Sequence, residues 1–548
     1  MMPSGWLPST HIAGEGWRTR AACRRATTLA ACLVLGSGVV GCAPAKREAG
    51  TVVMASGTDL ESGNPLVTIH TLTRQVQRHA LFVTLVRLDR AMQPVPYFAR
   101  RWSWNPTRTA LTLTLAHDLR WHDGVPTTAH DVAFTLTAVR DPALGAPRAT
   151  DFAQMDSVRA HSDTTVTVWY RTPQSSLPLV LAELPIVPRH LLDTVPVSQW
   201  RANSFARTPV GNGPFRFVDR TPGRRWRFAA NPDFPTSMGG PPKLRQLVVA
   251  VVDEAATKFA GLVSGELDIA GVSPTMASLV TRDPTLRIIT PPALFSMVLA
   301  FNTTRPPFDD TRVRRAIAFA LDRPRVVQVA LAGYATPAGG AIPPGLPTAS
   351  TAQPRLDVAT ADSLLDAAGW TRPIGQPRAP LQRNGRPLTV ELLTVGSGDM
   401  AMEQLVQADL AARGITVRIR VAEQGAFLSA VRATRKEFDV AITGIPGDLG
   451  SGQLSALFDS GARGGALDYT GFHRPDLDSL LRTARQAPPE RAVAAWHAVD
   501  AFLQVQAPVV WLYHARGVQG LSNRLEQVTM DLRGELVSVA QWTRREQP

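Results

Sequence analysis

Three histidines are each followed directly by an aspartate, in the pairs His117–Asp118, His122–Asp123 and His130–Asp131. Such residues can act as general bases or bind a metal ion when their side chains converge. The spacing does not favour convergence, because no two of these histidines stand four residues apart, as neighbours on a helix would. We therefore expect structural or surface roles and no cofactor, with a metal site of His117, His122 and His130 as the less favoured alternative.

Asp309 and Asp310 form a second arrangement that could do chemistry, since paired carboxylates act as acid and base in glycoside hydrolysis. They stand directly before a helical pattern in which apolar residues recur from Val313 to Leu321. An acid at a helix start pairs with free N–H groups and with the helix dipole. The chain also contains no H-E-x-x-H, G-x-S-x-G or G-x-x-x-x-G-K-[ST] motif. We therefore predict a helix cap and a protein that is not an enzyme.

The formal net charge is +13, and 54 of the 58 basic residues are arginine. A nucleic-acid-binding surface needs basic residues in runs, with aromatic side chains or a reading helix beside them. The densest cluster consists of Arg220, Arg224, Arg225 and Arg227 around Trp226, and the other arginines are scattered. We expect a solvated basic surface and no nucleic-acid partner, although such a surface can favour anionic ligands.

The length of 548 residues indicates two to four domains, and 44% apolar with 19% charged residues is ordinary for globular proteins. This composition excludes a wholly disordered chain and a protein with many membrane spans. All three cysteines, Cys23, Cys32 and Cys42, lie within the first 42 residues. The rest of the chain therefore has neither disulfides nor cysteine-ligated metal sites.

The N-terminus has the pattern of an export signal. Four arginines between Arg18 and Arg25 precede an uncharged, apolar run from Ala26 to Gly41, which is shorter than a membrane-spanning helix. The run ends in Val39-Val40-Gly41-Cys42, which resembles the lipobox of bacterial lipoproteins. We predict a signal peptide over 1–41, lipidation of Cys42, and a tether over 42–50. The mature protein is then expected outside the cytoplasm, in the periplasmic space, anchored to a membrane.

Alternating helix and strand patterns predict an α/β protein. Residues 111–115 alternate as a strand, and Thr128 with Asp131 forms an imperfect capping box before a helix. Thr360 is expected to cap a helix that Gly369 ends, and Asn384-Gly385 to form a tight turn. A strand at 388–393, a helix at 400–413 and a strand at 415–421 make a βαβ unit, which implies parallel strands. A further strand is expected at 507–513.

Five ordered segments resemble the family 5 extracellular solute-binding proteins, the receptors of ABC importers for oligopeptides, dipeptides, nickel and related solutes. They are Arg120–Val132, Thr208–Phe215, Gly265–Ala270, Phe301-Asn302 with Pro306–Ile317, and Leu364–Trp370. The resemblance covers essentially all of residues 51–520. Each segment alone is a weak signal, whereas five in the same order with a lipobox are a strong one.

The resemblance implies a periplasmic-binding-protein type II fold, with two lobes of mixed sheets joined by a hinge and an extra domain inserted in the first lobe. Carried over, lobe I is 50–89, 193–290 and 509–548, the inserted domain is 90–192, and lobe II is 291–508. The ligand is then enclosed between the lobes by hinge closure, an equilibrium that ligand contacts bias.

In peptide-binding members the ligand lies as an added strand between the lobes. By offset, the resemblance places the first-lobe edge at Leu72–Val76 and the second-lobe edge at Thr443–Asp448. The ligand contacts implied are Thr73, Arg74, Gln75, Thr443, Gly444, Ile445 and Asp448. Asp448 would pair with the α-amine of a peptide, or would be a plain loop acid.

Two departures from the family pattern concern this second edge. The aromatic residue before the aspartate is missing, with Gly444 and Ile445 in its place, and Gly450-Ser451-Gly452 replaces the usual Asp-Pro. The ligand could therefore differ from an ordinary peptide, and a neutral or anionic solute held by Arg74 is the next expectation.

The sequence thus predicts a lipid-anchored, monomeric solute receptor of an ABC importer, for peptides or a related small solute. Its partners would be the solute, the permease and ATPase subunits, and the membrane through the lipid. The alternative is an extracytoplasmic hydrolase or metal-dependent enzyme on a binding-protein scaffold.

Replacing the predicted lipidation site gives a first test. Cys42→Ser should abolish incorporation of labelled fatty acid and release the protein from the membrane fraction, because a serine cannot form the thioether. Cys32→Ser, within the same signal, is the control and should leave lipidation unchanged. A Cys42→Ser protein that still carries labelled lipid would show that the lipobox interpretation is wrong.

Overall fold

The computed structural model describes residues 47–397, 399–465 and 467–545, so the signal-peptide, tether and Cys42 predictions lie largely or wholly outside it. The chain divides into two units, Met1–Arg47 and Glu48–Pro548, and the second unit contains everything that follows.

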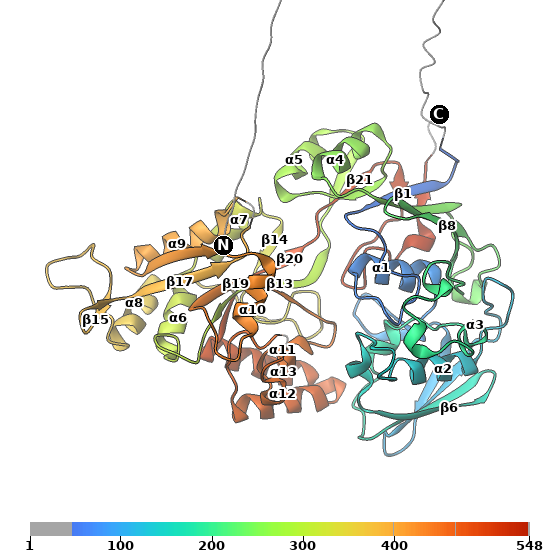
Figure 1. The fold of residues 1–548 in the computed structure, drawn as a ribbon, viewed down its shortest axis with the longest axis horizontal. Helices are drawn as coiled ribbons and strands as arrows, with labels where there is room; N and C mark the ends of the chain where they lie inside the picture. The colour runs from blue at the N-terminus through green and yellow to red at the C-terminus, as the bar shows by residue number, and fades with distance from the viewer. Residues whose placement is uncertain (1–46, 398, 466, 546–548) are drawn as a thin grey trace, which may run out of the picture. The chain divides into compact units, whose positions relative to one another are not determined.

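One seven-stranded mixed sheet forms around the first strand of this unit (Figure 1). In spatial order its strands are β12 (Leu286–Ile289), β21 (Gln519–Ser522), β11 (Ile269–Gly271), β1 (Thr51–Ser56), β10 (Gln246–Val251), β9 (Arg225–Ala230) and β8 (Phe215–Thr221). Strand β1 is parallel to β10, from Thr51 opposite Gln246 to Ser56 opposite Val251, and also parallel to β11. It is buried almost throughout, as central parallel strands are.

A six-stranded mixed sheet contains the predicted βαβ unit. In spatial order its strands are β14 (Ala335–Pro337), β20 (Val509–Arg516), β13 (Pro292–Phe301), β19 (Val440–Pro446), β17 (Thr389–Thr394) and β18 (Thr416–Val421). Strand β17 is parallel to β18 and β19, whereas β13 is antiparallel to β19 and β20. The predicted parallel pairing is confirmed.

Helices pack on both faces of the six-stranded sheet. One face, with Leu299 and Leu392, packs against α6 (Thr311–Ala320), α7 (Arg323–Ala330), α8 (Val358–Ala367) and α9 (Ala401–Ala412). The other face, with Val298 and Leu393, packs against α10 (Gln424–Arg432), α11 (Gln453–Phe458), α12 (Pro475–Gln486) and α13 (Pro489–Gln506). Adjacent residues thus enter different cores, as the two-residue strand period requires.

A four-stranded antiparallel sheet lies within residues 90–192, with strands β4 (Ala99–Trp104), β5 (Ala110–Leu115), β7 (Thr165–Tyr170) and β6 (Met155–Ser162) in spatial order. Helix α2 (Ala129–Ala138) packs on it and begins at the predicted capping box, in which Asp131 accepts the Thr128 N–H at 2.8 Å. The other oxygen of Asp131 accepts the Arg189 N–H at 2.9 Å, where α3 (Arg189–Leu192) begins. Asp131 therefore fixes the start of both α2 and α3.

The remaining elements are short or peripheral. They are α1 (Thr71–Val76), the π-helix η1 (Gln77–Leu81), β2 (Val86–Leu88), β3 (Pro94–Pro96), α4 (Ala255–Ser264), α5 (Ala277–Arg282), β15 (Gln382–Arg383), β16 (Arg386–Pro387), β22 (Leu525–Glu526) and β23 (Thr543–Arg544). Short 3₁₀ turns complete the described chain.

Most local predictions are confirmed, and one cap is wrong. Asp310 caps α6 by accepting the Arg312 N–H at 2.9 Å. Asn384 and Gly385 both have positive φ, as the predicted tight hairpin turn requires. Asp357, not Thr360, caps α8, because its carboxylate accepts both the N–H and the hydroxyl of Thr360.

The chain passes between the two large sheets twice. It leaves the seven-stranded sheet after β12 to enter β13, and it returns from β20 to β21. The first passage falls at the predicted boundary near residue 290. Strand β20 pairs with β13, so the second passage lies at 517–518. The lobe and inserted-domain assignments themselves stay predictions.

Truncating Asp131 tests its double role. Asp131→Ala should lower the free energy of unfolding by about 2–4 kcal/mol, because it removes a helix cap and leaves two backbone N–H groups without an acceptor. Urea denaturation measures this loss. Asp141→Ala is the control, since Asp141 accepts only the N–H of Ala143 near the surface. Equal losses for the two variants would contradict the role assigned to Asp131.

Candidate functional site

The carboxyl ends of β17 and β19 meet at one edge of the six-stranded sheet, which is where ligands bind in open α/β sheets. Strand β19 pairs with β13 along its whole length but with β17 only through Val440 and Ala441. In the described part of the chain, Thr443–Pro446 therefore has a strand neighbour on one side only. Three predicted contacts, Thr443, Gly444 and Ile445, lie in this stretch.

These three residues are not equivalent. The side chain of Ile445 is buried in the core and so cannot contact a ligand, whereas Thr443 and Gly444 are half-buried. A Cβ atom on Gly444 would overlap the ring of Phe295, which lies over it from β13 and is 38% exposed. The structure thus brings an aromatic side chain to the position where the sequence lacks one. A glycine inside a strand often marks such a close approach. Gly444 was therefore the sequence signal that could have indicated the Phe295 contact.

Asp448 lies in the loop between β19 and α11. Its carboxylate accepts backbone N–H groups from Gly450 at 2.7 Å, and from Gly452 and Gln453 at 3.0 Å. Burial raises the pKa of Asp448 above its ordinary value; the three N–H groups oppose this rise, and the Glu183 carboxylate adds to it. Asp448 therefore orders its loop, and Glu183 lies close enough to affect its charge.

The prediction of a first-lobe edge at Leu72–Val76 is wrong in one respect, because this segment is helix α1 and not a strand. The His70 side chain caps the helix by accepting the Thr73 N–H, so the backbone of α1 pairs within the helix and cannot pair with an extended ligand. Thr73 is only 1% exposed, and its hydroxyl accepts the Glu61 N–H. Gln75 packs against Gly534, whose φ of 138° suits glycine.

Arg74 is the charged residue among the predicted first-lobe contacts, and 39% of its side chain is exposed. It lies 3.9 Å from Glu183, which also pairs with Arg78 at 3.1 Å and with Arg148 at 2.5 Å. Burial alone would raise the pKa of Glu183, but the guanidinium groups of Arg148, Arg78 and Arg74 outweigh it and lower the pKa. Glu183, Arg78 and Arg148 were not predicted, because they meet only through long-range folding.

The His–Asp pairs do not assemble a reactive centre. His122 Nε2 lies 3.0 Å from the Gly213 carbonyl oxygen, and burial lowers the pKa of His122 to about 4. His130 lies 3.7 Å from Asp163, and Asp123 lies 2.7 Å from His190. Among the residues placed by the structure, no three His, Cys, Asp or Glu side chains form a candidate metal site. The site has an open strand edge, two carboxylates and an accessible guanidinium, which can bind polar solutes.

Neutralising Glu183 tests the electrostatic account. Glu183→Gln should cost about 3–5 kcal/mol at pH 7, as expected when one member of a buried ion pair is removed. A carboxylate with a lowered folded-state pKa stabilises the fold above its unfolded pKa, and this contribution disappears as the pH falls through the folded value. Urea denaturation should therefore show the difference between wild type and variant shrinking below about pH 4.5.

Glu391→Gln is the matched control, because Glu391 forms an exposed pair with Arg420 at 2.8 Å. That substitution should cost less than about 1 kcal/mol. A Glu183→Gln loss that is equally small, or that does not change with pH, would contradict the role given to Glu183.

Comparison with known proteins shows which family and which relatives this chain resembles. The family model of bacterial extracellular solute-binding proteins, family 5 middle, matches residues 93–464. A putative ABC transporter peptide-binding protein of Brucella abortus is 29% identical over 65% of this chain and 66% of its own length, so that match spans just under two thirds of the relative. The glutathione-binding protein of Escherichia coli is 25% identical over 89% of this chain and 93% of its length.

Solved structures agree with the fold. NikZ from Campylobacter jejuni, in complex with Ni(L-His), has a TM-score of 0.74 and 20% identity over 91% of this chain and 100% of its own. The oligopeptide-binding protein AppA from Bacillus subtilis, with a nonapeptide, has a TM-score of 0.72 and 22% identity over the same shares. The predicted α/β, type II binding-protein fold class is confirmed. Because the family model covers more than half of the chain, the protein belongs to the bacterial extracellular solute-binding proteins of family 5.

Proposed function

We propose that the protein is the solute receptor of an ABC importer and that it binds a peptide or a related small solute. The observation that carries this proposal is the edge of β19 at Thr443–Pro446, which pairs with β13 on one side and has no strand on the other among the described residues. Such an edge can pair with the backbone of an extended peptide. Relatives named as peptide-binding proteins support the same solute class.

The charges around this edge suit the two ends of a zwitterion. Asp448 favours an ammonium group, and Arg74 favours a carboxylate because its partner Glu183 is shared with Arg78 and Arg148. Asp448 can accept a ligand amine and keep its backbone N–H groups, because an ionised carboxylate has about four acceptor positions. The hydrolase or metal-dependent alternative receives no support from the comparisons.

Capture by lobe closure is part of the proposal. Two chain passages, β12 to β13 and β20 to β21, connect the two large sheets, and a pair of such connections can serve as a hinge. A solute that contacts both sides would shift the equilibrium towards the closed state. The permease and ATPase subunits of the importer would then be the partners that receive the loaded receptor.

We further propose a monomeric lipoprotein in the periplasmic space, anchored through Cys42. The N-terminal sequence pattern supports this location. Within the part of the chain that the structure describes, no helix has both the length and the apolar character needed to span a membrane.

A peptide-binding titration tests the function and the role of Asp448 together. Trialanine should bind the wild type, and Asp448→Asn should weaken this binding by about 10- to 100-fold, because it removes a charge-assisted bond and keeps the side-chain shape. N-acetylated trialanine should bind the wild type poorly and lose little more in the variant. Isothermal titration calorimetry measures all four affinities.

Asp476→Asn is the control, since Asp476 forms an exposed pair with Arg474. Equal wild-type affinity for free and acetylated trialanine would remove Asp448 from the ligand site. Absence of binding to either peptide, and to a mixture of di- and tripeptides, would contradict the peptide class.

A further inference from the structure

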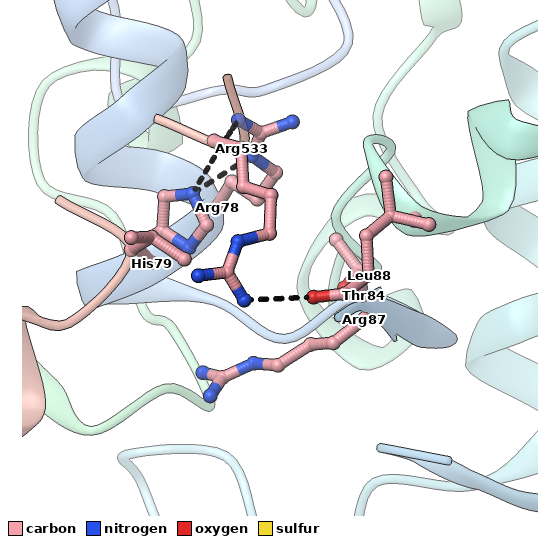
Figure 2. A pocket seen from close by; sticks show the side chains of 8 residues that line it. Arg78, His79, Thr84, Arg87, Leu88 and Arg533 are labelled. Atoms are coloured by element: carbon pink, nitrogen blue, oxygen red, sulfur yellow. Dashed lines mark hydrogen bonds between the residues drawn. The ribbon is translucent and has the colours of Figure 1, made fainter. Parts of the chain in front are cut away.

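A cavity of about 30 Å³ lies where η1, β2 and the C-terminal segment meet. Figure 2 shows the side chains that line it, including Arg78 and His79 from η1, Arg87 from β2, and Arg533. Leu88, Ala182 and Val537 complete an apolar part of the wall. Positive groups from residues 78–87 and from Arg533, which is distant from them in the sequence, therefore share one small space.

The charges at this cavity do not balance within the described chain. Arg78 pairs with Glu183 at 3.1 Å, and Arg533 pairs with Asp531 at 2.6 Å. The Arg87 guanidinium lies 3.8 Å from the centre of the Tyr97 ring and donates to its hydroxyl at 2.7 Å, but no described carboxylate forms an ion pair with it. Three guanidinium groups thus meet two carboxylates, which leaves one positive charge in excess.

Charges just outside the cavity do not supply the missing negative charge. Asp89 acts on Arg533, and Arg90 acts on Asp531, so the two outer groups carry opposite charges. Glu183 is also shared with Arg74 and Arg148, which reduces the negative charge that it supplies to Arg78.

His79 adds an unused hydrogen-bond donor. Its Nε2 lies 3.1 Å from Arg78 Nε, which can only donate, and 3.2 Å from the Arg533 carbonyl oxygen, which can only accept, so the two contacts call for opposite tautomers. Because that carbonyl already accepts a hydrogen bond from Arg78 Nη2, we assign Nε2 as the acceptor from Arg78 Nε. Burial, together with Arg78 and Arg87, lowers the pKa of His79 well below its ordinary value, which keeps the ring neutral. The single ring proton is then on Nδ1, which is buried and has no hydrogen-bond partner, in a side chain that is only 7% exposed.

We propose that this cavity binds a small monovalent anion, a halide or a carboxylate group, with Arg87, Arg533 and His79 as its main contacts. One negative charge would balance the excess, and the anion would accept the hydrogen from His79 Nδ1. The volume holds roughly two water-sized atoms, which suits these anions and not the larger sulfate. The proposal goes beyond solute reception and does not depend on it.

Thermal unfolding of the purified protein in different sodium salts at equal ionic strength is the first test. Gluconate is the reference, because its carboxylate carries a six-carbon chain that is too large for a cavity of about 30 Å³. Chloride or acetate should raise the melting temperature by about 1–3 °C over gluconate, the shift expected for a ligand at roughly ten times its Kd in a protein of this size. A response to chloride alone assigns a halide site, and a response to acetate assigns a carboxylate site. Equal melting temperatures in all three salts would overturn the proposal.

Arg87→Gln should abolish this salt response, and Arg87→Lys should retain part of it because the charge is kept. Arg224→Gln is the matched control, since Arg224 is an exposed arginine at the tip of the β8–β9 hairpin. An unchanged response in Arg87→Gln would overturn the proposed contacts. If that variant does not fold, bromide-soaked crystals of the wild type decide: an anomalous peak beside Arg87 and Arg533 is expected, and a cavity without one contradicts the site.

Discussion

The carboxylate of Glu183, whose side chain is 14% exposed, is the constraint on which this side of the candidate site depends. A buried charge costs several kcal/mol unless it is paired, so the arginines around Glu183 must stay in place while the protein is folded. Arg74 comes from α1, Arg78 from η1, and Arg148 from residues 90–192. Glu183 thereby connects its own segment with α1 and η1, which lie more than a hundred residues earlier in the chain. The side chain of Arg74, the most exposed of the three arginines, is therefore positioned by ion pairing and not by packing in a rigid core.

The opposite side of the site is built from backbone. The loop after β19 is ordered because Asp448 accepts the backbone N–H groups of Gly450, Gly452 and Gln453. Among the described residues, the strand edge before this loop has a strand neighbour on one side only. A ligand that pairs with such an edge is recognised mainly by its main chain, which is common to all peptides. Under the proposed function, discrimination between solutes would then come from charge at the two ends and from the exposed ring of Phe295.

The sequence predicted the elements whose signals are local. The capping box at Thr128, the cap at Asp310 and the turn at Asn384-Gly385 depend on residues within a few positions of one another, and the structure confirms them. Thr360 was misassigned because two acceptors competed for one helix start, and Asp357 binds both groups of Thr360. The site was harder to predict from the sequence, because an edge strand carried over from the family could not reveal that a helix, α1, begins at Thr71 after the His70 cap. Glu183 and its arginines meet through tertiary folding alone, without a local pattern.

The contact between Gly444 and Phe295 limits which substitutions this chain can accept during evolution. The two residues lie on neighbouring strands, 149 positions apart, and the ring occupies the space in which any side chain at 444 would stand. A large side chain at one of these two positions therefore requires a small residue at the other. An aromatic group at this strand end can thus be supplied from either strand, and an exchange between them must pass through an intermediate with small residues at both. We therefore expect these two positions to covary among related chains.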